Sequence, residues 1–176
     1  DAKVIAFQLD HAQAKVLIVD RECMALAQQA LQLADVQPVL IQYDDPEFTE
    51  LTEAVAADVL DYEAVIASGD ANFDWLMPTD EWDAISINYT SGTTGDPKGV
   101  VYHHRGAYLL AQGNALTTSM AKHAVYLWTL PMFHCNGWCF PWTLSAIAGT
   151  HVCLRQVRAE PIWSALAQED VTHLWG

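Results

Sequence analysis

The sequence predicts an α/β fold in which a layered, mostly parallel sheet is flanked by helices. Short apolar runs typical of buried strands alternate with segments of helical periodicity along the 176 residues. The apolar content of 52% is sufficient for a packed core. The first strand, helix and strand follow one another within about thirty residues, the length of a βαβ unit with parallel strands.

The first half of the chain contains that βαβ unit and then becomes less regular. We expect a strand, a helix and a strand over residues 15–20, 21–34 and 37–45. A helix is predicted over 45–57, with Asp45 as its N-cap and Pro46 at its first position. Residues 68–83 are predicted to be a loop.

After residue 83 the alternation of strands and helices resumes. The predicted strands are 84–90, 99–104, 124–132, 150–155 and 171–175. The predicted helices are 105–121, 136–149 and 160–170. Gly149 is expected to end the second of these helices, and Pro161 lies near the start of the third.

A glycine-rich loop, "TSGTTGDPKG" over residues 90–99, joins two strands that we expect to form a hairpin. Glycine lets the main chain approach a ligand closely, and successive backbone N–H groups form an anion-binding concavity. The hydroxyl groups add donors, and Lys98 adds a compact positive charge. We therefore predict a phosphate site made by Thr90, Ser91, Gly92, Thr93, Thr94, Gly95 and Lys98.

Other interpretations of this loop are possible. It is not a Walker loop, because Lys98 precedes Gly99 and an apolar strand instead of a hydroxyl residue that opens a helix. This difference, and the absence of an obvious metal-binding Asp after the loop, weaken the hypothesis of a phosphoryl-transfer enzyme. A flexible surface turn is the simplest alternative.

A second cluster of chemically active side chains, "LPMFHCNGWCFPW", spans residues 130–142 beside a strand end. Ligands of parallel α/β folds bind outside the carboxyl ends of strands, so this segment is a candidate pocket wall. Alternatively, His134 and the aromatic residues belong to the core. A zinc site at His134, Cys135 and Cys139 is disfavoured, because no paired Cys-x-x-Cys spacing supplies a fourth ligand. We predict no metal site.

Three basic residues follow the second strand of the hairpin. His103 and His104 are a possible metal pair, but capping of the following helix is the more common role of such residues at a strand–helix junction. Arg105 is expected to be structural and not a phosphate ligand.

Charge and cysteine content narrow the classes of function. A formal net charge of −14 argues against nucleic acid and anionic membranes as partners. No apolar run reaches the length of a membrane span. The cysteines are too few and too irregular for a disulfide framework, which favours a reducing cytoplasmic location; they are Cys23, Cys135, Cys139 and Cys153.

The string "YTSGTTGDPKGVV" resembles the phosphate-binding signature of the adenylate-forming superfamily, which includes acyl-CoA synthetases, adenylation domains and luciferases. "VYHHRGAYL" is similar to the acyl-CoA synthetase version. "PMFHCNGWCFPWT" resembles synthetases for short- or medium-chain fatty acids, including methylthiopropionate. The resemblance implies that residues 1–176 are an internal fragment of the AMP-binding N-terminal domain, without the C-terminal domain.

The resemblance also implies a function. A carboxylic acid, expected to be a short- or medium-chain fatty acid, would react with ATP and Mg²⁺ to give an acyl-adenylate, and coenzyme A would then form the thioester. Lys98 would stabilise phosphate, while the main catalytic lysine and the adenine, ribose and Mg²⁺ sites would lie outside the chain. His134, Asn136, Gly137 and Trp138 would contact the acid.

Two further expectations follow. The fragment alone is expected to be inactive, and the full-length enzyme is a possible homo-oligomer. The alternative function is a non-catalytic α/β module that binds a nucleotide or anion and has kept only the phosphate loop.

Overall fold

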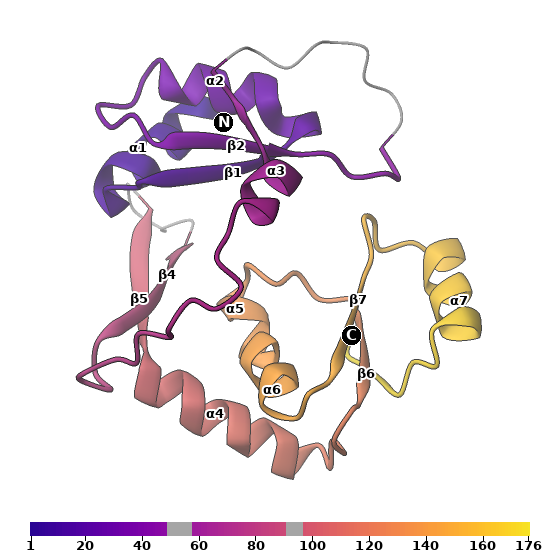
Figure 1. Cartoon of the computed structure of the whole chain (residues 1–176). Coiled ribbons are helices and arrows are strands. Elements are labelled where there is room, and N and C mark those ends of the chain that lie inside the picture. The colour runs from indigo at the N-terminus through magenta and orange to yellow at the C-terminus, as the bar shows by residue number, and fades with distance from the viewer. Residues whose placement is uncertain (49–57, 91–96) are drawn as a thin grey trace. The chain divides into compact units, whose positions relative to one another are not determined.

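The computed structural model describes residues 1–48, 58–90 and 97–176 (Figure 1). These residues form two compact units, Asp1–Leu76 and Met77–Gly176. Each unit contains parallel strands with helices beside them, so the predicted α/β fold class is confirmed. No helix in the described ranges is both long enough and apolar enough to cross a membrane.

The first unit is built on the predicted βαβ arrangement. Its strands pair in parallel in the order β1-β2-β3, with bounds Val16–Asp20, Val39–Tyr43 and Leu60–Asp61. The connection from β1 to β2 contains a short 3-10 helix, Arg21–Cys23, and then α2, Met24–Leu31. Ala27 and Ala30 of α2 are buried, as its helical periodicity predicts.

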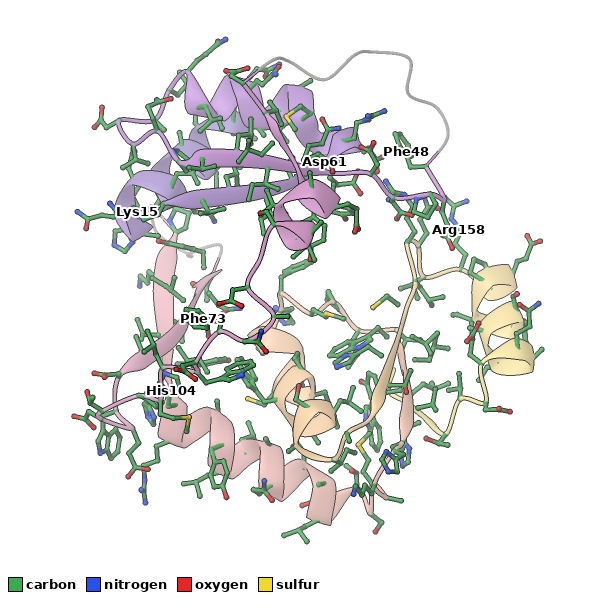
Figure 2. All side chains as sticks on the ribbon, viewed as in Figure 1. Lys15, Phe48, Asp61, Phe73, His104 and Arg158 are labelled. Carbon is green, nitrogen blue, oxygen red and sulfur yellow. The ribbon has the colours of Figure 1, made fainter. Side chains whose placement is uncertain are left out.

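Two helices of this unit are absent from the sequence-based prediction. Helix α1, Ala2–Ala12, packs against α2 and begins at Asp1, whose carboxylate accepts the backbone N–H of Lys3 at 2.7 Å. Helix α3, Tyr62–Ala67, begins in the same way after Asp61, which is labelled in Figure 2. Both have an acidic N-cap that is visible in the sequence.

The predicted helix over 45–57 is only partly covered by the described residues. Asp45 accepts the backbone N–H of Glu47 at 2.9 Å, and the N–H of Phe48 bonds to the Asp45 carbonyl. This is the local hydrogen bonding of a turn. The remainder, residues 49–57, lies outside the described ranges.

The predicted loop over residues 68–83 runs from the first unit into the second. The predicted hairpin follows it. Strands β4, Ala84–Thr90, and β5, Lys98–His103, pair antiparallel, with a bulge between Ala84 and Ser86. Helix α4, His104–Thr117, follows β5 directly. The ring Nδ1 of His103 accepts the backbone N–H of Gly106 at 2.9 Å, which confirms the predicted capping role.

A parallel three-stranded sheet completes this unit, in the order β7-β6-β8. The strands are Val125–Trp128 (β6), Thr150–Cys153 (β7) and His173–Leu174 (β8). Helices α6, Phe140–Ala146, and α7, Ala159–Gln168, lie on opposite sides of these strands in Figure 1. This is expected when the chain moves first one way and then the other along the sheet with right-handed crossovers.

The core of this unit lies between β6 and α6. Tyr126 and Trp128 point to the same side of β6 and pack against Phe140 and Leu144 of α6. The rings of Tyr126 and Phe140 stack with their centroids 5.1 Å apart. Aromatic packing therefore fixes α6 on the strand that precedes it.

The prediction of one helix over 136–149 is wrong. The segment forms a four-residue turn of helix, α5, Cys135–Trp138, and a separate helix, α6. Cys139 separates the two helices, and its backbone is left-handed with a φ of 63°. Pro141 lies in the first turn of α6, where its missing N–H costs nothing, and so marks a helix start that the apolar pattern obscured.

Candidate functional site

The end of the β4–β5 hairpin carries the two described flanks of the predicted phosphate site. Thr90 and Lys98 are directly opposite each other in the strand register, and both are exposed. Residues directly opposite in an antiparallel pair project to the same face. The hydroxyl and the ammonium group therefore share one face at the mouth of the loop. Ser91, Gly92, Thr93, Thr94 and Gly95 lie outside the described residues.

Gly99 has a packing role that the loop argument did not identify. A Cβ at Gly99 would lie 2.6 Å from Cδ1 of Ile87, on the opposite strand. The absence of a side chain at Gly99 therefore leaves room for Ile87 to pack against β5. Gly99 supports the hairpin, whereas the ligand-approach argument applies to glycines outside the described ranges.

Asn88 connects the hairpin to the second motif. Its side-chain Nδ2 donates to the carbonyl oxygen of Phe133 at 2.7 Å. Strand alternation places Asn88 on the same face as Thr90, two residues along, and therefore on the face of Lys98. The two motifs, about forty residues apart in the sequence, thus meet on one face of the hairpin.

The segment that follows Phe133 displays His134 and Trp138 on the surface. The His134 side chain is exposed, and Trp138 is 62% exposed. The alternative in which His134 is a core residue is therefore wrong, and so is a core role for Trp138. Phe140, at 6% exposure, is the aromatic residue of this motif that does belong to the core. The side chain of Asn136 is not among those described.

Four of the five residues from 135 to 139 have a left-handed backbone conformation. The φ angles of Cys135, Gly137, Trp138 and Cys139 are 49°, 54°, 56° and 63°. Non-glycine residues pay about 1–2 kcal/mol each for this conformation. Such strain persists only where surrounding contacts impose it, and it concentrates at functional sites.

Gly137 fits this turn for two reasons. Its positive φ is the conformation that glycine adopts without cost. In addition, a Cβ at this position would lie 2.7 Å from the ring of Trp128. The Trp128 ring is itself fixed, because its Nε1 donates to Nδ1 of His151 at 2.9 Å. Burial lowers the pKa of His151, which favours the neutral form that accepts this bond.

Side chains from two helices hold the other end of the turn. Nδ2 of Asn114, on α4, donates to the carbonyl of Trp138 at 2.8 Å and lies 3.3 Å from Oγ1 of Thr143. The fully buried Thr143 hydroxyl donates to the carbonyl of Cys139 at 3.0 Å. Sequence reasoning missed Asn88, Asn114 and Thr143; the signal was a polar side chain inside an otherwise apolar element.

A cavity of about 240 Å³ lies between β5, α4 and Cys139. Its lining is mostly apolar, with one phenol, one imidazole and one thiol: Val101, Tyr102, His103, Gly106, Ala107, Leu110 and Cys139. Burial, followed by the nearby Cys135 and Cys139 thiols, raises the pKa of Tyr102. Burial also raises the pKa of Cys139. The phenol and the thiol are therefore neutral at ordinary pH, within a lining that is largely apolar.

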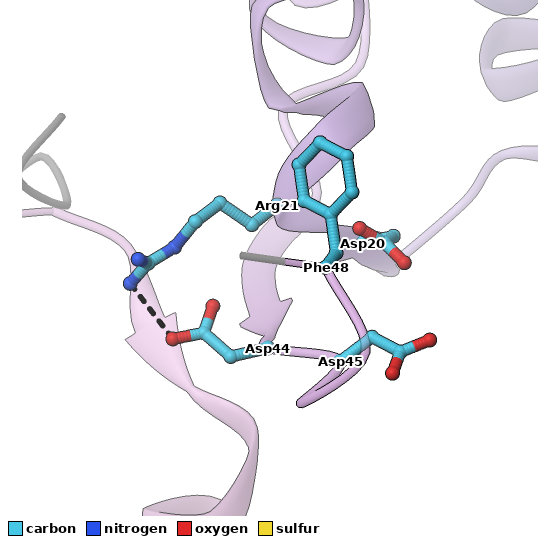
Figure 3. Close-up of a pocket in the computed structure, with 5 residues that line it drawn as sticks. All are labelled: Asp20, Arg21, Asp44, Asp45 and Phe48. Carbon is cyan, nitrogen blue, oxygen red and sulfur yellow. Dashed lines mark ion pairs between the residues drawn. The ribbon is translucent and has the colours of Figure 1, made fainter. Parts of the chain in front are cut away.

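The first unit has a smaller cavity of about 140 Å³ at the carboxyl ends of β1 and β2 (Figure 3). It is lined by Asp20, Arg21, Asp44, Asp45 and Phe48. Nη2 of Arg21 pairs with Asp44 at 2.7 Å, and Asp20 and Asp45 each accept a backbone N–H of the following turn. The carboxylates pair with Arg21 or with the local backbone, whereas Nε of Arg21 is buried with no hydrogen-bond partner among the described residues. We assign no ligand to this cavity.

The two basic residues that follow the hairpin, His104 and Arg105, lie in the first turn of α4. Arg105 forms an ion pair with Glu81 and lies over the ring of Trp82, which supports the expected structural role. His104, labelled in Figure 2, opens α4. Within the part of the chain that the structure describes, no three His, Cys, Asp or Glu side chains are grouped to hold a metal ion. Cys135 is exposed while Cys139 is buried, and all four cysteines are free.

Comparison with known proteins assigns the family. The model of the AMP-binding enzyme family matches residues 1–176. The chain belongs to the AMP-binding enzyme family. An acetate/butyrate–CoA ligase of Arabidopsis thaliana, named as peroxisomal, is 48% identical over 98% of the chain and 32% of its own length. An acetate–CoA ligase of Humulus lupulus is 44% identical with the same coverage.

A solved structure shares the fold of the chain. The luciferase-like enzyme of the mealworm Zophobas morio superposes on 99% of this chain and 38% of its own, with a TM-score of 0.75 at 18% identity. The chain therefore spans about a third of the length of the AMP-binding relatives that it matches. At this identity the structural likeness supports the fold and not the substrate.

Proposed function

We propose that this chain contributes the phosphate-binding hairpin and part of the acid-binding wall of an AMP-forming acyl-CoA ligase for short-chain acids. The observation that carries the proposal is the Asn88–Phe133 hydrogen bond. It brings the phosphate hairpin and the His134 segment, which are distant in sequence, onto one face. A ligase that joins an acid to a nucleotide phosphate needs these two sites side by side.

The phosphate site is proposed to hold ATP through Thr90, Ser91, Gly92, Thr93, Thr94, Gly95 and Lys98. The shared face of Thr90 and Lys98 at the mouth of the loop supports this proposal. The ammonium group of Lys98 would offset the charge that develops on pyrophosphate as it leaves. We propose that Mg²⁺ accompanies ATP, with phosphate and water oxygens among its ligands.

The acid is proposed to lie against His134, Asn136, Gly137 and Trp138, with its apolar end toward the cavity between β5 and α4. The exposure of His134 and Trp138 and the apolar lining of that cavity support this role. The two curated relatives are named for acetate and butyrate, which favours a short acyl chain over a medium one. Coenzyme A would then accept the acyl group as a thioester.

The decisive measurement is acid-dependent exchange of pyrophosphate into ATP, followed by thioester formation with coenzyme A. The complete gene product should be tested with acetate, propanoate, butanoate, hexanoate and a set of amino acids. We expect exchange that is strongest with acids of two to four carbons. A preference for amino acids or long acyl chains would contradict the proposed substrate class. ATP binding without exchange for any acid would favour the non-catalytic module.

Residues 1–176 alone are proposed to be inactive, because the chain spans about a third of the related ligases. Pyrophosphate release by these residues alone would contradict this. The cytoplasmic location expected from the cysteines stays a prediction, since one relative is named as peroxisomal. Imaging of a fluorescent fusion of the complete gene product beside a peroxisomal marker tests it.

A further inference from the structure

The strained turn over residues 133–139 has a tether at each of its two ends. Both tethers are asparagine amides, and neither amide belongs to a motif by which the sequence resembles related enzymes. Because Cys135, Trp138 and Cys139 are left-handed without being glycine, the turn needs such outside contacts to persist.

The first tether comes from the hairpin. Asn88 lies in the middle of β4, half-buried, and donates from Nδ2 to the Phe133 carbonyl at 2.7 Å. The Phe133 side chain is 79% exposed, so its own packing holds this end of the turn weakly. The hydrogen bond from Asn88 is thus a specific contact between the strand that leads to Thr90 and the residue before His134.

The second tether comes from α4. Asn114 donates from Nδ2 to the Trp138 carbonyl at 2.8 Å, next to the buried Thr143 hydroxyl that binds the Cys139 carbonyl. Trp138 is also largely exposed, so its ring contributes little packing against α4. Loss of the Asn114 donor would leave the Trp138 carbonyl without this partner and remove a reason for the left-handed conformation.

We propose that Asn88 and Asn114 are positioning residues that hold this turn in place and thereby set where the carboxylic acid lies relative to Lys98. The inference rests on the proposed function, because it assigns the turn to acid binding. Asn88 fixes the turn to the strand that carries the phosphate loop, and Asn114 fixes its orientation over α4. Neither side chain needs to touch the acid or ATP.

The test uses Asn88→Asp and Asn114→Asp in the complete gene product. Aspartate keeps the shape of asparagine but has no N–H donor, and its charge repels the carbonyl. We expect the KM for the acid to rise about tenfold in each variant, the cost of one lost hydrogen bond. The KM for ATP should change less than about twofold, because the phosphate loop keeps its own contacts.

A second measurement is independent of activity. The Cys139 thiol is 5% exposed at the end of the turn, so its alkylation by iodoacetamide reports opening of the turn. Mass spectrometry should show faster labelling of Cys139 in both variants without any substrate. Asn72→Asp is the matched control, since it makes the same chemical change at an exposed loop residue. It should alter neither labelling nor KM.

The outcomes separate this inference from the proposed function. An unchanged acid KM in folded variants overturns the inference, as does an equal rise in the KM for acid and for ATP. Unchanged Cys139 labelling overturns the tethering itself. If the unmodified protein activates no acid, the proposed function fails, and the role in acid binding fails with it. If the Asp variants do not fold, Asn88→Ala and Asn114→Ala remove the donors without adding charge.

Discussion

The pairing of β4 with β5 determines where the Lys98 side chain lies. It begins β5 opposite Thr90, so the register of the hairpin decides which face its ammonium group occupies. A register shift of one residue would send the charge to the opposite face. The role of this residue can therefore be tested without disturbing the core.

Lys98→Ala should lower acid-dependent pyrophosphate exchange in the complete gene product by about 10²–10³-fold, the usual cost of losing one preorganised charge-stabilising donor. The melting temperature should hardly change, because the side chain is exposed. Lys122→Ala, at another exposed lysine, is the control and should keep full exchange. A loss below about threefold at Lys98 would remove it from its proposed role.

Tyr126, in contrast to the exposed Lys98, carries a polar hydroxyl group that lies in the core. Its side chain is fully buried, and its hydroxyl has no hydrogen-bond partner among the described residues. Burial raises its pKa to about 12. A buried hydroxyl without a partner weakens the folded state, because it gives up its bond to water.

Tyr126→Phe should therefore raise the free energy of unfolding by about 1 kcal/mol, measured by urea denaturation near pH 7. The wild-type protein should also lose stability as the pH rises from about 10 to about 12. In that window the unfolded tyrosine ionises while the buried one does not, which favours the unfolded chain. The Tyr126→Phe variant should lack this part of the loss of stability at alkaline pH. A destabilised variant would show that the hydroxyl has a partner.

At the scale of elements, the left-handed turn α5 is the clearest departure from sequence rules. The pattern over 136–149 is that of one apolar helix, yet contacts to Trp128, Asn114 and Thr143 impose two pieces. Tertiary contacts override the local helix propensity of this segment. Gly137 and Gly113 allow the left-handed conformation of α5 to be tested, because Gly137 lies in the left-handed turn and Gly113 in the right-handed helix α4.

Gly137→Ala should destabilise the protein by about 1–3 kcal/mol, because alanine at φ 54° is strained and its Cβ would contact the Trp128 ring. Gly113→Ala is the matched control within α4, where an added Cβ meets no atom within 4 Å. It should stabilise by about 0.5–1 kcal/mol. Thermal denaturation of both variants gives the comparison. Equal effects of the two substitutions would contradict the left-handed turn.

At the scale of the whole molecule, the chain consists of two compact units that meet in sequence at Leu76 and Met77. The loop between them exposes large apolar side chains, including Phe73, labelled in Figure 2, and Trp75, which is 88% exposed. Such a segment has few contacts that resist local opening.

Limited digestion with chymotrypsin should therefore cut first between Phe73 and Met77, because this protease prefers large apolar residues in accessible backbone. Mass spectrometry of the early fragments should show two products that correspond to the units. Trp163, on the surface of α7, is the internal control, since it is also exposed but lies in a helix. A first cut there, or inside α4, would contradict the division.

The order of strands and helices was predictable wherever the apolar residues followed clearly either the helical or the strand periodicity. The βαβ unit, the β4–β5 hairpin and α4 follow directly from it, and so does the capping by His103. Helices α1 and α3 were missed although Asp1 and Asp61 precede them as caps. A short helix with a modest apolar face gives a weak periodic signal, and the cap alone does not decide it.

The sequence by itself determined the family, because the loop and its flanking strands carry a string that chance does not produce, and the family match covers the whole chain. It also predicted that Lys98 and the His134 segment belong to the site. Only the tertiary structure decided how they meet. The Asn88–Phe133 and Asn114–Trp138 hydrogen bonds join residues 45 and 24 positions apart, and no local pattern encodes such pairs. Local propensity acts over a few residues, whereas the strained turn is contacted by side chains that are distant in sequence, among them the amides of Asn88 and Asn114.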